Sequence, residues 1–94
     1  MTVKIMIKRK VQDQNLSELT MLLKKLRALT LEQPGYVSGE TLSRIDKPDE
    51  SLVISTWRSL EDWNSWVNNP KRNEIQSAID KLLGQETEYA MYKA

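Results

Sequence analysis

Alternation of apolar and polar positions opens the chain and predicts a β-strand. Val3, Ile5 and Ile7 are separated by longer side chains, of which Lys4 and Lys8 are charged. A period of two is the pattern of a strand with one buried face and one wetter face. We therefore expect the first strand over Val3–Lys8.

The pattern then changes to that of an amphipathic helix. Leucines recur at steps of three and four residues from Leu16 to Leu29, which places them on one helical face. Asn15 followed by Glu18 is a capping signature at the start of this segment. Pro34-Gly35 ends the region, because proline cannot continue a helix and glycine tolerates a left-handed turn.

A hairpin is predicted next. The segments Tyr36–Ile45 and Leu52–Trp57 have the composition of strands, and the polar stretch Asp46–Glu50 lies between them. A turn of this length joins antiparallel neighbours. The second of these strands ends in the apolar run that leads to Trp57.

Helical spacing returns after this hairpin. Ser59 and Asp62 form a capping box, in which the serine side chain accepts a first-turn N–H and the aspartate reaches back. Asn69-Pro70 interrupts the helical region and restarts it, with Asn as N-cap and Pro at the first helical position. Gly84 is expected to end the second segment, and Glu86–Tyr92 reads as the final strand.

The order βαββαβ predicts one α+β domain over residues 1–94. It is the ferredoxin-like, split βαβ arrangement, a four-stranded antiparallel sheet with its helices on one face. Apolar side chains must then point away from the helices, because successive strand residues alternate faces. They are expected to include Met6, Tyr89 and Met91 or their strand neighbours, and either Val53 or Ile54. An uncovered apolar face favours a homodimer packed sheet to sheet.

Composition narrows the function classes. Fourteen basic and thirteen acidic residues leave a net charge of +1, so no overall field favours nucleic acid or a membrane surface. The charged first residues cannot form a signal peptide or membrane span, and we expect a cytoplasmic protein. The chain has no cysteine and no histidine, which disfavours a transition-metal site.

Two segments carry a resemblance to a known family. Residues 32–42, EQPGYVSGETL, and residues 52–70, LVISTWRSLEDWNSWVNNP, resemble the antibiotic biosynthesis monooxygenase domain. The shared features are a Pro-Gly turn that leads a strand, a Trp that ends the third strand, acidic residues at the next helix start and a Pro break after an aromatic position. The resemblance implies a dimeric α+β barrel. It also implies a functionally mixed family of cofactor-independent oxygenases, haem-degrading enzymes and members without known activity.

Departures from the family pattern bear on cofactors. Members often carry His at the positions of Trp66 and Lys71 in this chain. The haem-degrading branch uses an Asn at the position of Lys8 and a His at that of Gln76, and neither is present. Without an imidazole there is no evident axial ligand for haem iron. We therefore expect no haem, metal or other cofactor.

The candidate substrate-binding residues follow from the resemblance. They are Trp66 for stacking, Asp62 one turn away as a base, Lys8 or Arg44 for charge, and Gln76. Each also has a structural interpretation. Trp66 can be core, Asp62 a helix cap and Gln76 a solvated helix residue, while Lys8, Arg9 and Arg44 can be strand charges that protect a sheet face or edge. A cluster of these three cations inside the cleft would instead favour a phenolate or carboxylate ligand.

Two functions remain open from the sequence. The first is a cofactor-independent monooxygenase that acts on a small electron-rich aromatic, a quinol or phenol. The second is a non-catalytic dimeric module, for binding or for structure, whose interior is filled by Trp and Leu side chains. A cleft of a few hundred Å³ beside Trp66 would favour a small-molecule site.

Overall fold

The computed structural model describes residues 2–11 and 16–93. Its elements follow the predicted order βαββαβ, and the second helical region is split in two at the Asn-Pro break. They are β1 (Val3–Lys10), α1 (Leu16–Leu31), β2 (Tyr36–Ser43), β3 (Glu50–Trp57), α2 (Leu60–Val67), α3 (Pro70–Leu83) and β4 (Glu88–Lys93). The capping role expected of Asn15 lies outside the described residues.

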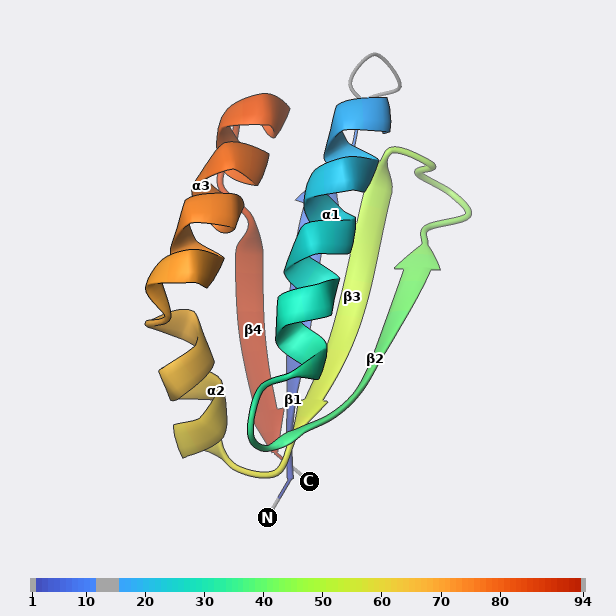
Figure 1. The fold of residues 1–94 in the computed structure, drawn as a ribbon. Helices are drawn as coiled ribbons and strands as arrows, with labels where there is room; N and C mark the ends of the chain where they lie inside the picture. The colour runs from blue at the N-terminus through green and yellow to red at the C-terminus, as the bar shows by residue number, and fades with distance from the viewer. Residues whose placement is uncertain (1, 12–15, 94) are drawn as a thin grey trace.

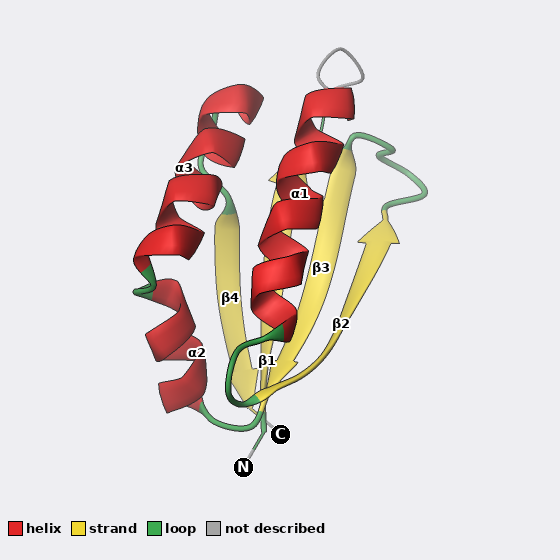
Figure 2. Cartoon of the chain, in the orientation of Figure 1, coloured by secondary structure: helices red, strands yellow, loops and turns green. Residues whose placement is uncertain are grey.

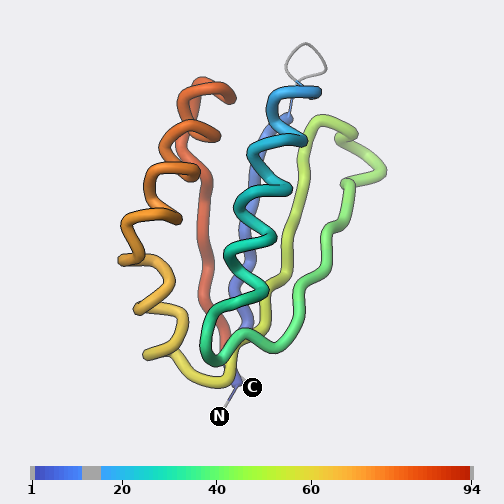
Figure 3. The backbone as a smooth tube through the Cα atoms, viewed as in Figure 1, coloured from blue at the N-terminus to red at the C-terminus, as the bar shows by residue number. Residues whose placement is uncertain are grey.

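One antiparallel sheet supports the three helices. Its strand order is β2-β3-β1-β4, so the first and last strands of the chain run side by side (Figure 3). All three helices lie on the same face of this sheet (Figures 1 and 2). None of the helices in the described part of the chain has the length and apolar character needed to cross a bilayer.

The core forms between β1 and the helices. Val3, Ile5 and Ile7 are buried on the helix side of the sheet, as the period-2 pattern predicts, and pack with Trp57, Trp63 and Trp66. Trp57 is fully buried, and its Nε1–H donates to Ser55 Oγ at 2.7 Å. The Trp57 ring meets that of Trp63 nearly edge-on, with centroids 5.8 Å apart. The tryptophans thus tie α2 to the sheet, and the indole that is most deeply buried keeps its polar atom satisfied.

The strand register decides which apolar side chains remain on the open face. Met6 pairs with Ile54 and with Ala90, whereas the buried Ile5 pairs with Met91 and Ile7 pairs with Tyr89. Directly opposed residues point to the same side of a sheet. Tyr89 and Met91 therefore face the helices, and their strand neighbours Ala90 and Tyr92 face away. The sequence did not decide between Val53 and Ile54 in β3. In the structure Ile54 points to the face of the sheet opposite the helices, the open face, and Val53 points to the core.

Helix α2 is anchored to the turn before β2 through its cap. The Ser59 side chain accepts from the Asp62 N–H at 3.2 Å, as predicted. The Asp62 carboxylate does not reach the backbone of Ser59 but accepts from its hydroxyl at 3.0 Å. A Cβ on Gly35 would collide with the Asp62 side chain, and Gly35 has φ +84°. Only glycine fits this turn without displacing the cap.

Two glycine substitutions should therefore differ in cost. Gly84→Ala places a Cβ in open space at φ +74° and should cost about 1 kcal/mol, the strain of the left-handed conformation. Gly35→Ala adds the collision with Asp62 to the same strain. We expect a clearly larger loss in the free energy of unfolding, measured by urea denaturation. Equal losses for the two variants would show that the Asp62 contact has no effect on stability.

Candidate functional site

A cleft of about 270 Å³ opens between α1, α3 and the sheet. Its aromatic wall includes Trp63 and Trp66 from α2, Tyr36 from β2 and Tyr89 from β4. The floor comes from the helix-facing side chains of β1 and β3. The cleft therefore lies on the helix side of the sheet, next to the hydrophobic core.

Two of the predicted site residues line this cleft. Trp66 contributes to its wall, and it also borders a second cavity of about 360 Å³ beside Asn69 and Pro70. Gln76 lines the cleft and is 7 % exposed, so it is not the solvated helix residue of the structural interpretation.

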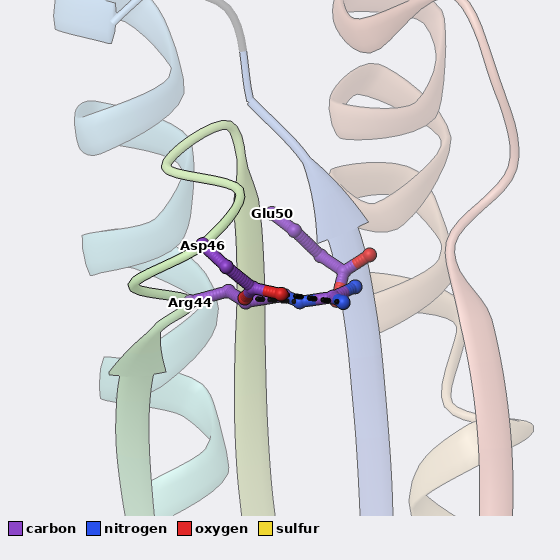
Figure 4. Close-up of polar contacts among 3 residues, drawn as sticks. All are labelled: Arg44, Asp46 and Glu50. Carbon is purple, nitrogen blue, oxygen red and sulfur yellow. Dashed lines mark hydrogen bonds and ion pairs between the residues drawn. The ribbon is translucent and has the colours of Figure 1, made fainter.

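The other three predicted residues lie elsewhere. Lys8 is exposed and points to the open face of the sheet, opposite the helices. Asp62 caps α2 as described above. Arg44 lies at the turn between β2 and β3, where it donates to Asp46 at 2.7 and 3.0 Å and to Glu50 at 3.3 Å (Figure 4). None of these three residues lines the cleft, so we leave them out of the proposed site.

The predicted site residues omit the two buried arginines of the cleft. Arg9 and Arg72 both line it, and each is only 6 % exposed. The sequence favours a strand charge over a cleft residue for Arg9, yet Arg9 continues the alternation of Val3, Ile5 and Ile7 on the buried face. That continuation was the available signal. Arg72 had no such signal, because its burial depends on how α3 packs against Tyr89.

A hydrogen-bond network fixes the orientation of the Gln76 amide. Gln76 Nε2 donates to Asp80 Oδ1 and to Thr87 Oγ1, both at 2.8 Å. The Thr87 hydroxyl donates in turn to Asp80 Oδ1 at 2.7 Å. These contacts occupy the amide nitrogen and leave Oε1 as acceptor for Arg9 Nη2 at 3.2 Å. Asp80 thus acts on Arg9 through the intervening Gln76 amide.

Arg72 is held by aromatic rings. Its guanidinium carbon lies 5.8 Å from the Trp63 ring centroid and 5.6 Å from that of Tyr89, within the range of cation–π attraction. Its Nη2 donates to Tyr89 Oη at 2.7 Å and its Nη1 to Asn73 Oδ1 at 3.0 Å. Since Tyr89 Oη is an acceptor in this contact, its own proton is available for another partner.

The charged side chains around the cleft favour the binding of an anionic ligand. Burial lowers the pKa of Arg9, opposed by Tyr89 and Asp80 and reinforced by the nearby positive charge of Arg72. Arginine keeps its proton in proteins even so. Lys24 and Arg27 of α1 also line the cleft, and Glu40 is the single acidic residue among the described lining residues. Glu40 pairs with Ile54, which faces away from the helices.

The described part of the chain does not contain a cluster of metal-binding side chains. Within residues 2–11 and 16–93, no three Asp, Glu, His or Cys side chains gather as a metal site would require. Apart from Glu40, the charged and hydroxyl groups that line the cleft can donate hydrogen bonds: they are guanidinium, ammonium and hydroxyl groups. Such groups can hold and stabilise an anion.

Comparison with known proteins identifies relatives of this arrangement. A family model described as antibiotic biosynthesis monooxygenase matches residues 2–78. No curated protein matches the chain at a significant level.

Solved structures with the same fold are numerous. A conserved protein from Methanosarcina mazei Go1 superposes with a TM-score of 0.89 at 19 % identity, covering 99 % of this chain and 92 % of that one. SnoaB from Streptomyces nogalater, described as a cofactor-independent oxygenase, gives 0.84 at 19 % identity with coverages of 99 % and 92 %. Rv0793 from Mycobacterium tuberculosis gives 0.85 at 16 % identity with coverages of 100 % and 95 %. The predicted ferredoxin-like fold is confirmed.

The environment of Tyr89 makes a prediction about alkaline pH. Burial raises the pKa of Tyr89, although Arg72 and Arg9 partly oppose the shift. The folded state therefore holds this proton more tightly than the unfolded state. The resulting stabilisation is complete below the ordinary tyrosine pKa of about 10 and is lost as the pH rises through the higher folded value. Ultraviolet titration of tyrosinate should show a step above the ordinary range, and Tyr89→Phe should remove it. The same late step in the variant would assign it to another tyrosine.

Proposed function

The chain belongs to the antibiotic biosynthesis monooxygenase family, and from that membership we propose that it oxygenates a small electron-rich aromatic, a phenol or quinol, without a cofactor. The observation that carries the proposal is the cleft beside Trp66, which combines aromatic walls with two buried guanidinium groups. The description of SnoaB as a cofactor-independent oxygenase supports it. So does the absence of histidine and cysteine from the sequence.

The chemistry explains why positive charge matters. Triplet oxygen reacts slowly with closed-shell organic molecules, so the substrate must release an electron readily, which a phenolate or quinolate does. In a balanced reaction, a quinol and O₂ give a hydroxyquinone and water: one oxygen atom enters the ring, and the other leaves with two hydrogens. The protein has to lower the cost of forming the substrate anion and hold it in place. Arg72 and Tyr89 are the donors proposed for the reacting oxygen.

No carboxylate is proposed as the base. Asp62, the base suggested by the resemblance, is occupied as the cap of α2, and Tyr89 has a raised pKa, so at neutral pH it is a donor. The proposed mechanism instead lowers the pKa of the substrate phenol by the nearby positive charges. The proton then passes to water at the mouth of the cleft.

The size of the cleft supports a substrate of one or two rings. A cavity of about 150 Å³ holds one benzene molecule, and this cleft measures about 270 Å³. Trp66 and Trp63 supply faces on which a planar ring can stack. The open cleft also favours a small-molecule site over the alternative module with a filled interior.

Oxygen uptake with a reduced naphthoquinol or an anthrone tests the proposal. The native protein should accelerate uptake over autoxidation. Arg72→Met removes a charged donor and should lower kcat by about 10²-fold, the usual loss for one such group. Trp66→Ala should mainly raise KM through lost stacking. Arg44→Met is the matched control, since Arg44 lies in the exposed turn of Figure 4, and should retain the native rate.

The non-catalytic alternative gives a different outcome in the same assay. In that case the native protein adds nothing to autoxidation for any aromatic of the panel. Quenching of tryptophan fluorescence by the same compounds would then distinguish a binding module, which responds, from a structural one, which does not.

We further propose that two copies of the chain pack through their open sheet faces. By the strand register, all four strands contribute side chains to this face. The helices of the described chain lie on the other side of the sheet (Figure 1). The apolar members of this face are Leu42, Leu52, Ile54, Met6, Ala90 and Tyr92. Lys4, Lys8 and Glu88 share the face, so an isologous contact can bring opposite charges together at its margin. The dimeric α+β barrel implied by the family resemblance is this arrangement.

A charge at the centre of this face should separate the copies. Ile54→Lys buries an unpaired ammonium group at the proposed interface, which is strongly unfavourable. We expect the native chain to sediment as a dimer at micromolar concentration, and the variant as a monomer or an insoluble protein. Met21→Lys provides the control, because Met21 is 62 % exposed on α1, away from the sheet. A native chain that sediments only as a monomer contradicts the proposal.

A further inference from the structure

We infer that the cleft binds an aromatic carboxylate, with the carboxylate group held by Arg9. The inference deepens the proposed function and rests on it for one point, namely that the oxidisable ring and the carboxylate belong to the same substrate. The substrate class is then a phenol or quinol that also carries a carboxylate group.

The first argument is the burial of Arg9 without an ionic partner. Its side chain is 6 % exposed, yet the ion pairs among the described residues involve Arg44 alone. Its hydrogen bond to Gln76 Oε1 is to a neutral acceptor, and Asp80 stands behind that amide. A buried charge is costly unless it is paired. Arg72, equally buried, adds a second positive charge close by.

The second argument is an unpartnered donor in the same side chain. Arg9 Nε has no hydrogen-bond partner and is the only such buried side-chain nitrogen or oxygen found in the described residues. Buried donors are almost always satisfied in native proteins. The residue lines the cleft, so a ligand can supply the missing acceptor with a small adjustment of the side chain.

The shape of the free edge indicates a carboxylate. The Nε–H and one Nη2–H of a guanidinium lie parallel on one edge, and a carboxylate offers two oxygens at the matching spacing. Arg9 uses Nη2 for a single acceptor, Gln76 Oε1, and this nitrogen carries two hydrogens. A phenolate has one oxygen and can bridge both donors only through bent, weaker hydrogen bonds, whereas a carboxylate meets each donor with its own oxygen.

The two buried arginines therefore have different roles. Arg72 is held between Trp63 and Tyr89 and shares its Nη2 with the phenol oxygen of Tyr89, which suits it to the oxygen of a ring. Arg9 is oriented by Gln76 and suits the carboxylate. Lys24 and Arg27 at the same cleft raise the local concentration of an anionic ligand.

A binding experiment with matched probes tests this inference. The probes are 2-naphthoate, 2-naphthamide and 2-naphthol, which share the ring system and differ in charge and donors. Binding is measured by quenching of tryptophan fluorescence, with isothermal calorimetry as a second readout. The native chain should bind 2-naphthoate at least about 10-fold more tightly than 2-naphthamide, and the preference should weaken as salt is added.

Variants identify the residue responsible. Arg9→Met should remove the preference for 2-naphthoate but keep the affinity for 2-naphthamide. Arg9→Lys should keep part of the preference, because it retains charge without the two-donor edge. Arg44→Met should behave as the native chain. Circular dichroism checks that each variant is folded, and the comparison of probes on the native chain needs no variant.

The outcomes separate this inference from the proposed function. Equal affinities of the native chain for 2-naphthoate and 2-naphthamide overturn the inference, as does a preference that survives in folded Arg9→Met. Because these probes are not consumed, the result does not depend on oxygen uptake. If the native protein oxidises quinols but shows no preference for 2-naphthoate, only the inference is overturned. If it prefers 2-naphthoate but oxidises no quinol, only the proposed function is overturned.

Discussion

The alternation of side chains along the central strand β1 constrains the whole molecule. This strand pairs with β3 on one side and with β4 on the other, so its register sets which face every neighbouring side chain occupies. Val3, Ile5 and Ile7 fall beneath the helices and bury the core. Because the period of a strand is two, Arg9 must then follow them to the same face.

That placement turns one end of the core into a charged cleft. The apolar row of β1 ends in a guanidinium group, and the residues around it are arranged as its supports. Gln76 accepts from Arg9, and Asp80 and Thr87 hold the Gln76 amide. The free energy of desolvating Arg9 is offset in part by these contacts and by the field of Asp80. A site with such charge is suited to the substrate anion that we propose.

The two faces of the sheet therefore serve different purposes. On the helix side, tryptophans join the core to the cleft: Trp57 is wholly internal, Trp63 packs against it and stacks near Arg72, and Trp66 lines two cavities. On the other side, the register gathers aliphatic side chains that no helix covers. The same rule of alternation produces both the interior that contains the cleft and the open surface that we propose for contact with a second copy.

The sequence by itself determined the element order, the N-caps Ser59 and Asn69 and the family, because these depend on local patterns along the chain. It also singled out Trp66, which lines the cleft. It could not decide which of two neighbouring apolar residues, Val53 or Ile54, faces the core. It could tell which of Lys8 and Arg9 is internal only if the alternation of β1 was extended to its end. Arg72, Gln76 and Tyr89 come together from α3 and β4, which lie next to each other only after the sheet has formed. The composition of the cleft was decided by that packing, because burial and charge pairing are properties of neighbours in space.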